Sequence, residues 1–492
     1  MLSRIGPKVY VNGVQTVRNY KELIITEILR NTKGSHGPMP HTLINDTKLK
    51  NIDNKIIEMI EHQASKGKDY WSFKGRSVRE NAHIYYQYPA MMIPGMQREL
   101  LDIILRHQKA VLNVLDPFVG SGTTMTECMF RGLNFVGQDI NPLAVLVCKA
   151  KLGPYNHKEL SQSTEDILAA IKEDKSDDID IFFPGLIKWF RADVATALSK
   201  VRRAIMKNNL LYARRFFYVA LSEAVRLCSN SRTTTYKLHA REKAEIYSRR
   251  VDVVGTFMEI VSRNLTHLKK QQETLSAAGL LRNYLYSGHV DIALKDTCLE
   301  IVLPNGIEHY DLVITSPPYG DNKSTVPYGQ SSFLPLQWIP LCDIDETIDP
   351  SCLKTTYEID SRSMGGTLLV DKTKVAEIMD ISPTFREVRE FLLQIGQDKA
   401  QRVASFFVDL NRSLCSIRRV VRKNAYMIWT VGNRHVAGLE IPMDTILTDL
   451  FAYNGVQLIA TLDRTIPSKR MPTRNSITST MRREHILIFR AL

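Results

Sequence analysis

Residues 311–320 read DLVITSPPYG, an apolar run that ends in two prolines and a tyrosine. Pro317 and Pro318 fix φ at roughly −65° and carry no backbone N–H, so this corner leaves carbonyl oxygens free to accept hydrogen bonds. Ser316 offers a hydroxyl oxygen as a second acceptor, and Tyr319 offers a flat face. Acceptors aimed at both protons of an aromatic amine would localise the nitrogen lone pair for attack on a methyl group. Taken alone, the corner is also typical of a strand that simply ends at proline.

A second motif, DPFVGSGTT at 116–124, lies where a strand is expected to turn into a helix. Gly120 and Gly122 would let the backbone approach a ligand without an intervening Cβ. Asp139 follows Gly120 by 19 positions, close to the spacing of about 20 for a carboxylate that binds ribose hydroxyls. The turn lacks both the third glycine of a dinucleotide fingerprint and the lysine of a P-loop. An isolated G-x-G favours a tight turn, but with Asp139 it predicts a nucleoside-bearing cofactor other than NAD or ATP.

Together these motifs resemble S-adenosylmethionine-dependent amino-methyltransferases that act on DNA, and the upstream YYQYPAMMIPGMQRELLDIIL resembles the companion cofactor motif of that family. The resemblance implies S-adenosyl-L-methionine as the cofactor, with Asp139 on its ribose and Asp296 near its adenine amino group. By themselves, Tyr-Pro-Ala is a proline-led helix start and Asp296 a helix N-cap. The implied cofactor-binding residues are Tyr88, Pro89, Ala90, Asp116, Phe118, Gly120, Gly122, Thr123, Asp139 and Asp296.

In the same family T-S-P-P-Y is the catalytic motif. The resemblance implies that Ser316 and the Pro317 carbonyl contact the amine, Pro318 shapes the turn, and Tyr319 stacks on a base flipped out of the duplex. The cofactor motif precedes the catalytic motif in this chain. The residues of the two motifs are nevertheless typical of family members in which the catalytic motif comes first. Serine at the first catalytic position is typical of cytosine N4 methylation, and adenine N6 remains the alternative base.

The elements that must position these residues alternate between strands and helices, which predicts a parallel α/β fold. The resemblance makes it a Rossmann-like methyltransferase fold with a mostly parallel seven-stranded sheet and a helical insertion. Ser316 would then lie at the carboxyl edge of the sheet, where open α/β folds bind ligands. The expected helix spans residues 96–108, and the expected strands span residues 111–118, 134–140, 311–316 and 425–432.

Six segments follow from this pattern. They are an accessory segment (1–79), a cofactor half (80–154), a first insertion (155–285), a catalytic half (286–320), a second insertion (321–400) and closing strands (401–492). The accessory segment shows helical periodicity at 20–31 and 53–65 around a loop at 33–41. The first insertion is basic and helical and is the candidate DNA-binding region, whereas the second is polar and irregular with a helix near its end and is the candidate target-recognition or lid region.

Basic residues outnumber acidic ones by 65 to 52, which gives a net charge of +13 and favours an anionic partner such as double-stranded DNA. Residues 186–250 hold 15 Lys/Arg and 4 Asp/Glu, a local net of +11, with aromatic residues whose helical spacing is equally typical of core packing. A second basic run, RTIPSKRMPTR, could also clamp DNA, and either run could be a solvated face. The predicted nucleic-acid contacts are Arg202, Arg203, Arg214, Arg232, Lys237, Arg241, Lys469 and Arg470.

Other function classes find no support in the sequence. The seven cysteines are scattered without metal-ligand spacing, so neither a disulfide framework nor a metal is expected. No apolar run approaches the roughly 18 residues of a membrane helix, and the start lacks a secretory h-region, so we expect a cytoplasmic protein. The resemblance implies that the cytoplasm is that of a prokaryote. The sequence predicts a site-specific DNA methyltransferase, and the resemblance implies a restriction or defence nuclease as its partner. A tRNA amino-methyltransferase and an inactive DNA-binding scaffold are the alternatives.

Overall fold

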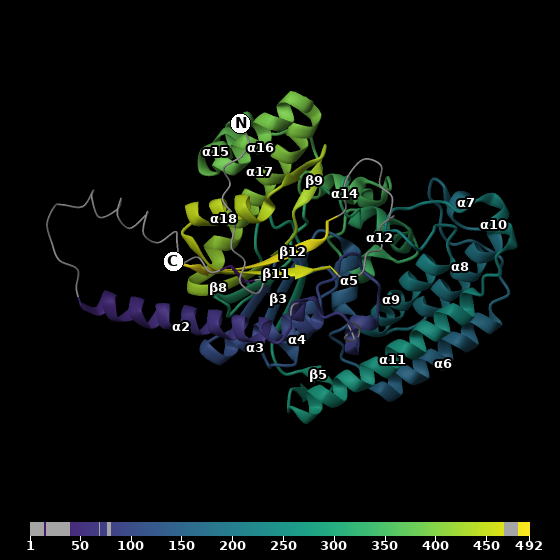
Figure 1. Cartoon of the computed structure of the whole chain (residues 1–492). Coiled ribbons are helices and arrows are strands. Elements are labelled where there is room, and N and C mark those ends of the chain that lie inside the picture. Colours follow the sequence, from purple (N-terminus) through teal and green to yellow (C-terminus); the bar gives the residue numbers. More distant parts are fainter. Residues whose placement is uncertain (1–13, 16–39, 68, 76–79, 467–480) are drawn as a thin grey trace.

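The computed structural model describes residues 14–15, 40–67, 69–75, 80–466 and 481–492 (Figure 1). Its central sheet has the strand order β1-β11-β12-β8-β7-β2-β3-β6. The strands are β1 (Val14–Gln15), β2 (Asn113–Asp116), β3 (Asn134–Asp139), β6 (Val290–Leu294), β7 (Tyr310–Thr315), β8 (Val421–Val431), β11 (Val456–Thr465) and β12 (Arg483–Ala491). Strands β6, β3, β2, β7 and β8 are mutually parallel, whereas β12 is antiparallel to both β8 and β11. The expected Rossmann-like, mostly parallel sheet is confirmed, and the two-residue β1 adds an eighth strand at its edge.

Both faces of this sheet are buried, which explains why its strands read as continuous apolar runs. Successive side chains of β2 separate into two cores, since Val114 belongs to one and Leu115 to the other. In β7, Leu312 packs in the first core and Val313 in the second. A sheet sandwiched in this way has only its edges and strand ends free, so the chemistry must lie at those ends.

Helices cover the two faces in separate groups (Figure 1). The first core contains side chains of α2 (Pro40–Ala64), α3 (Pro94–His107), α4 (Thr123–Met129) and α5 (Pro142–Lys149). The second contains those of α17 (Gln397–Val420) and α18 (Met443–Tyr453). The helix expected over 96–108 corresponds to α3, which begins with proline as helix starts often do. The expected helix at 53–65 is the last part of the longer α2, whereas residues 20–31 lie outside the described part of the chain.

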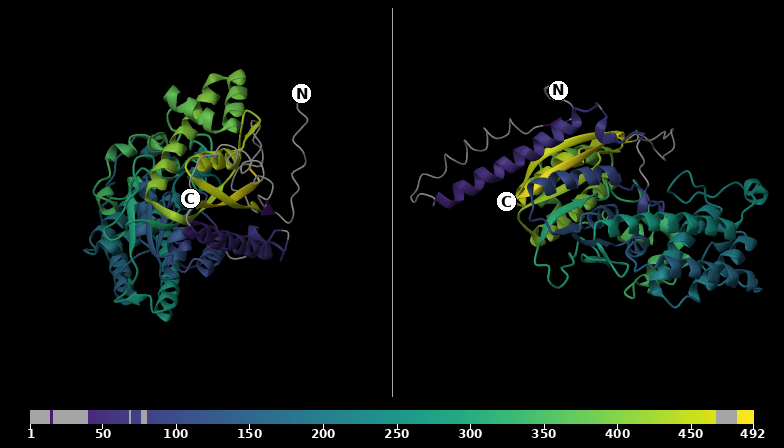
Figure 2. Two further views of the ribbon diagram at one scale, coloured as in Figure 1. Left: turned by 90° about the vertical axis from the view of Figure 1, so that its left-hand side faces the viewer. Right: turned by 90° about the horizontal axis from the view of Figure 1, so that it is seen from below.

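The first insertion is helical, as expected, and stands to one side of the sheet (Figures 1 and 2). Its aromatic residues Phe216, Phe217 and Tyr218 are fully buried, so core packing is their role, as the helical spacing indicated. A short hairpin of β4 (Leu281–Arg282) and β5 (Leu285–Tyr286) leads back to the sheet. The helices are α6 (His157–Glu173), α7 (Leu186–Trp189), α8 (Ala192–Met206), α9 (Leu211–Cys228), α10 (Lys243–Ser248) and α11 (Val253–Ala277).

The second insertion is mostly helical, so the expectation of an irregular segment with one helix was wrong. Prolines are normally read from sequence as the end of a helix, yet Pro335 lies inside one. Such prolines interrupt the helical pattern of polar and apolar residues, so the pattern did not predict these helices. The helices instead form because buried residues such as Phe333 and Phe385 dock them onto the core. They are α12 (Tyr328–Gln337), α13 (Leu341–Ile344), α14 (Glu358–Arg362), α15 (Lys372–Ile381) and α16 (Pro383–Ile395), with a 3-10 turn η3 (Pro350–Leu353).

Smaller elements complete the fold. A hairpin of β9 (Arg434–Val436) and β10 (Leu439–Ile441) follows β8, and two 3-10 turns, η1 (Tyr70–Ser72) and η2 (Asn81–Ile84), precede α3. Within the described ranges, no helix combines the length and the apolar character that crossing a bilayer demands.

Candidate functional site

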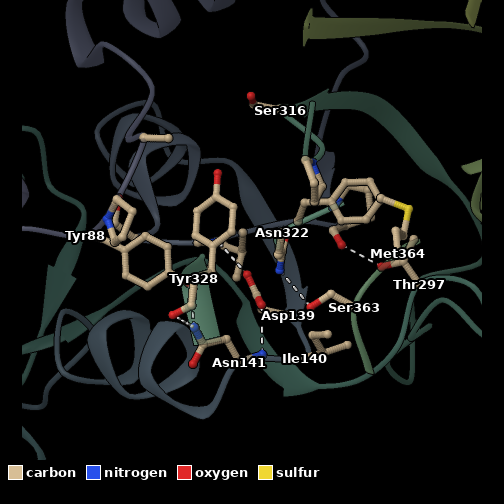
Figure 3. Close-up of a pocket in the computed structure, with 18 of the residues that line it drawn as sticks. Tyr88, Asp139, Ile140, Asn141, Thr297, Ser316, Asn322, Tyr328, Ser363 and Met364 are labelled. Atoms are coloured by element: carbon tan, nitrogen blue, oxygen red, sulfur yellow. Dashed lines mark hydrogen bonds between the residues drawn. The ribbon is translucent and has the colours of Figure 1, made fainter. Parts of the chain in front are cut away.

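A pocket enclosing about 830 Å³, part of it open to solvent, lies at the carboxyl edge of the parallel strands. Its walls are the residues that directly follow β2, β3, β6 and β7, together with the turn before α3 and parts of the second insertion. Figure 3 shows Ser316 on one side, Asp139 and Asn141 on the other, and the rings of Tyr88 and Tyr328 between them. The lining comprises 88–92, 117–121, Thr123, 139–141, 295–297, Ser316, Pro318, Asn322, Tyr328, Ile359, Ser363 and Met364.

The glycine-rich turn is built as its sequence requires. Gly120 and Gly122 have φ of 48° and 71°, in the left-handed region that favours glycine. A Cβ on Gly122 would stand 2.9 Å from the sulfur of Cys148, so the close packing also excludes a side chain. Gly120 and Thr123 line the pocket, whereas Gly122 supports the turn from below. At Gly120 this wall therefore carries no side chain, which suits close approach by a ligand.

Asp139 ends β3 and faces the same pocket. Its Oδ2 accepts a hydrogen bond from the Gly120 amide at 3.0 Å, and its Oδ1 accepts one from the Asn141 amide at 2.9 Å. Burial raises the pKa of this carboxyl to about 6. Because each carboxylate oxygen has a further lone pair, the group is held in place and can still accept hydrogen bonds from a ligand. The sequence spacing between Gly120 and Asp139 thus brings the carboxylate into hydrogen-bonding contact with the Gly120 amide.

Asp116 is fully buried and does not line the pocket. Its Oδ1 accepts hydrogen bonds from the Thr315 hydroxyl at 2.6 Å and the Phe118 amide at 3.2 Å, while Oδ2 has no partner among the described residues. Burial raises its pKa to about 7. Asp116 therefore connects the end of β2 by a hydrogen bond to the end of β7, which Ser316 directly follows. Phe118, two residues after Asp116, does line the pocket.

The Tyr-Pro-Ala element and Asp296 also reach the pocket. Tyr88, Pro89 and Ala90 form one wall, and the Tyr88 hydroxyl accepts a hydrogen bond from the Asn141 side chain at 3.0 Å. Asp296 accepts a hydrogen bond from the Cys298 amide at 2.9 Å within a turn, so it does not cap a helix. Its position in the lining fits the contact that the resemblance implied.

Sequence reasoning missed two residues of the pocket, the aromatic Tyr328 and the polar Asn322. Tyr328 stacks on Tyr88 with ring centroids 5.9 Å apart and an interplanar angle of 25°. Asn322 lines the pocket and donates hydrogen bonds to Asp360 and Ser363. Both come from the second insertion, where no motif marks them. Sequence reasoning also missed Asn141, although its position two residues after Asp139 could have marked it.

The Ser-Pro-Pro-Tyr corner contributes Ser316 and Pro318 to the pocket, whereas Pro317 and Tyr319 do not line it. The Ser316 hydroxyl lies 3.2 Å from the Tyr319 hydroxyl, which donates to Glu484 at 3.1 Å. Burial and the charge of Glu484 hold the pKa of Tyr319 well above its usual range. Stacking of Tyr319 on a flipped base stays a prediction, and the ring stack seen in the pocket belongs to Tyr88 and Tyr328 instead.

Four of the six predicted nucleic-acid contacts that lie in the described part of the chain form ion pairs within the protein. Arg203 pairs with Asp174 at 2.7 Å and with Asp180, and Arg202 pairs with Asp180 at 3.3 Å. Arg241 pairs with Glu245. These carboxylates compete directly with phosphate for the same guanidinium groups, so the charge count overstates what this surface offers to DNA.

Arg214 forms a two-point contact with a carboxylate of the second insertion. Its guanidinium donates to both carboxylate oxygens of Asp343 at 2.8 Å, and the Tyr218 hydroxyl donates to the same carboxylate at 3.0 Å. The geometry is that of a bidentate pair, which is stronger than a single contact. It joins α9 of the first insertion to α13 of the second.

We expect Arg214→Ala to destabilise the protein by about 2 kcal/mol, because it strips a partly buried carboxylate of its charged partner. Urea unfolding measures this, and Asp343→Asn should cost a similar amount because it removes the same pair. DNA affinity at fixed salt should stay within about twofold of wild type. A large loss of DNA affinity without a loss of stability would contradict this role.

Arg232 and Lys237 differ from this group. Both are exposed, and within the described ranges neither side chain has an ion-pair partner. They line a second hollow together with hydroxyl residues, and this hollow shares Pro89 with the first pocket. Lys469 and Arg470 lie outside the described residues. No group of three His, Cys, Asp or Glu side chains in the described part of the chain could hold a metal ion.

Comparison with known proteins gives consistent matches. A family model described as DNA methylase matches residues 40–150. The chain is 31% identical over 449 residues to the type II methyltransferase M.MvaI of Kocuria varians, covering 88% of this chain and 94% of that protein. It is 34% identical over 94 residues to the type II methyltransferase M.MjaII of Methanocaldococcus jannaschii, covering 19% of this chain and 17% of that protein. The rRNA methyltransferase aviRa of Streptomyces viridochromogenes is similar in structure at a TM-score of 0.29 and 9% identity, covering 82% of this chain and 89% of that one, which is too slight a likeness to carry an argument.

Proposed function

Because the chain belongs to the prokaryotic family of DNA amino-methyltransferases, we propose that it methylates the exocyclic amine of a flipped base in duplex DNA, cytosine N4 in the first place. One observation carries this proposal. Ser316 of the acceptor corner and Gly120 and Asp139 of the nucleoside-binding turn line a single pocket, although they lie far apart in the sequence. Such a pocket can hold a methyl donor and an acceptor nitrogen side by side.

The residues present fit S-adenosyl-L-methionine. The side-chain-free turn at Gly120 offers room for close approach, Asp139 offers acceptors for ribose hydroxyls, and Asp296 lies where an adenine amino group could be bound. When bound, this cofactor supplies a methyl group on a positively charged sulfur, ready for transfer to a nucleophile. The protein then has to orient the cofactor and prepare the nitrogen.

Ser316 and the Pro317 carbonyl carry out that preparation. The amine nitrogen of cytosine is a poor nucleophile, because its lone pair is delocalised into the ring. Hydrogen bonds from both amine protons to the Ser316 hydroxyl and the Pro317 carbonyl draw the nitrogen towards tetrahedral geometry and free its lone pair for attack. The prolines preset the corner, so little reorganisation is needed when the base arrives.

The test of this proposal is product identification. Labelled S-adenosylmethionine is offered with duplex DNA of varied sequence and with tRNA, and the methylated nucleosides are identified by mass spectrometry. We expect N4-methylcytosine in DNA. N6-methyladenine would keep the reaction class and change the base, label in tRNA alone would assign the protein to RNA methylation, and no transfer to any substrate would support an inactive scaffold.

The names of both relatives contain the words type II methyltransferase. We therefore propose that methylation protects a specific site from a partner restriction nuclease. DNA isolated from a host that expresses this protein should resist cleavage at the modified sequence, and modification-sensitive sequencing would give that sequence.

Arg232 and Lys237 are proposed to bind the DNA backbone beside the flipped base, because they are unpaired within the described part of the chain and their hollow adjoins the pocket. Replacing both with alanine should weaken DNA binding and lower the slope of log affinity against log salt by about 2. Fluorescence anisotropy over a salt series measures both quantities.

The matched control replaces Lys172 and Lys175, which are exposed near the end of α6, with alanine and removes the same charge. It should leave the salt slope unchanged. Equal effects from the two pairs would mean that DNA responds only to net charge, and would rule out a dedicated contact at Arg232 and Lys237.

A further inference from the structure

We propose that Glu484 is a positioning residue that turns the Ser316 hydroxyl into an obligate hydrogen-bond acceptor, acting through the hydroxyl of Tyr319. This inference rests on the proposed function and adds to it a residue outside the catalytic corner. Glu484 lies on β12, far from Ser316 in the sequence, and no motif marks it.

The carboxylate of Glu484 is fixed from two sides. Its Oε2 accepts a hydrogen bond from Nε of Arg464 at 2.6 Å, and its Oε1 accepts one from the Tyr319 hydroxyl at 3.1 Å. Arg464 and Glu484 are direct partners in the β11–β12 register, and their side chains are only 7% and 14% exposed. The carboxylate contacts the guanidinium directly, and a carboxylate can only accept hydrogen bonds.

The direction of each hydrogen bond follows from this carboxylate. Since Glu484 only accepts, the Tyr319 hydroxyl must donate its single proton to it. The Tyr319 oxygen is then left as an acceptor for the Ser316 hydroxyl, 3.2 Å away. Once Ser316 donates its own proton to Tyr319, the lone pairs of its oxygen are left for the pocket that Ser316 lines.

The opposite polarity would prevent catalysis. If Tyr319 donated to Ser316, the serine proton would be free to point at the amine, where an N–H donor would meet an O–H donor. The nitrogen lone pair would then gain no localisation from this contact. Glu484 excludes that arrangement, and its charge strengthens the Tyr319 hydrogen bond.

The Tyr319 ring is also held so that its hydroxyl cannot swing away. A Cβ placed on Gly432, just after β8, would stand 2.9 Å from Cδ2 of Tyr319. The ring therefore packs directly on bare backbone. The close packing explains why a tyrosine outside the pocket lining is still part of the catalytic corner.

The experiment measures single-turnover methyl transfer at saturating cofactor and DNA for Glu484→Gln, Tyr319→Phe and the double variant. Each single variant should lower the rate by about 10- to 100-fold, with the Kd values for cofactor and DNA within about twofold of wild type. Because Glu484 acts through the Tyr319 hydroxyl, Glu484→Gln should cost almost nothing further in the Tyr319→Phe background.

Additive losses in the double variant would overturn the inference, as would full activity of Glu484→Gln. The matched control is Asp463→Asn, which removes the negative charge from the 2.7 Å contact to His485 on the neighbouring rung of the same hairpin. It should keep the wild-type rate, and an equal loss there would show that hairpin integrity is what matters. A wild-type protein that transfers no methyl group to any DNA would overturn both this inference and the proposed function.

Discussion

Ser316→Ala is expected to lower the rate of methyl transfer by about 100- to 1000-fold, the usual cost of removing one preorganised hydrogen-bonding group from a transition state. Ser316 lines the pocket and its hydroxyl lies 3.2 Å from the Tyr319 hydroxyl, so alanine removes the proposed acceptor and introduces no bulk. The Kd for S-adenosylmethionine should stay within about twofold of wild type, because Asp139, the proposed ribose contact, lies on the other side of the pocket (Figure 3).

The measurement is single-turnover transfer of labelled methyl groups, paired with calorimetric titration of the cofactor. Ser161→Ala, on α6 of the insertion, is the control for removing a serine hydroxyl far from the pocket. Loss of cofactor binding in Ser316→Ala would contradict the division of roles between the two sides of the pocket. An unchanged rate would show that the Pro317 carbonyl alone prepares the amine.

The parts of the site that the sequence predicted are those placed by strand ends. Asp139 ends a strand of the parallel part of the sheet, and Gly120 and Ser316 follow two others. Parallel strands bring their carboxyl ends to one edge whatever separates them in the chain. A local pattern of strand, turn and carboxylate therefore suffices to place them together. The same logic predicted the order of helices and strands in the cofactor half.

The residues that escaped prediction reach the site through long-range packing. Tyr328 comes from a segment whose prolines hide its helix, and Glu484 comes from the last strand, where antiparallel pairing with β8 and β11 brings it to Tyr319. Neither position shows in spacing or composition. Register between distant strands is a property of the folded sheet, which no short window of sequence contains.

Charge was the least reliable guide, and Arg203 shows why. The arginine count in the first insertion indicated a DNA-binding face, yet Asp174 and Asp180, which lie just before that stretch in the sequence, pair with Arg203. Arg214 meets its partner Asp343 from the other insertion. A count of residues gives the total charge, whereas binding to phosphate depends on the cations that no carboxylate already holds.

Asp139→Asn is expected to weaken S-adenosylmethionine binding by about 10- to 100-fold, the cost of losing charge-assisted hydrogen bonds to the ribose. The amide keeps the shape of the carboxylate but offers one acceptor oxygen, and its NH₂ group would face either the Gly120 amide or the Asn141 amide, each of which is itself a donor. Methyl transfer at saturating cofactor should fall much less than cofactor affinity, which is the reverse of the result expected for Ser316→Ala.

The same carboxyl makes cofactor affinity depend on pH. Its pKa is raised to about 6 by burial, so the carboxylate form is present above pH 6 and is lost as the pH falls through that value. Wild-type affinity should therefore weaken between pH 7 and pH 5, whereas Asp139→Asn, which has no group to titrate there, should show a flat profile over this range. Parallel pH profiles for the two proteins would assign the dependence to another group and remove Asp139 from the ribose contact, because only a group that both touches the ligand and titrates can make the profiles differ.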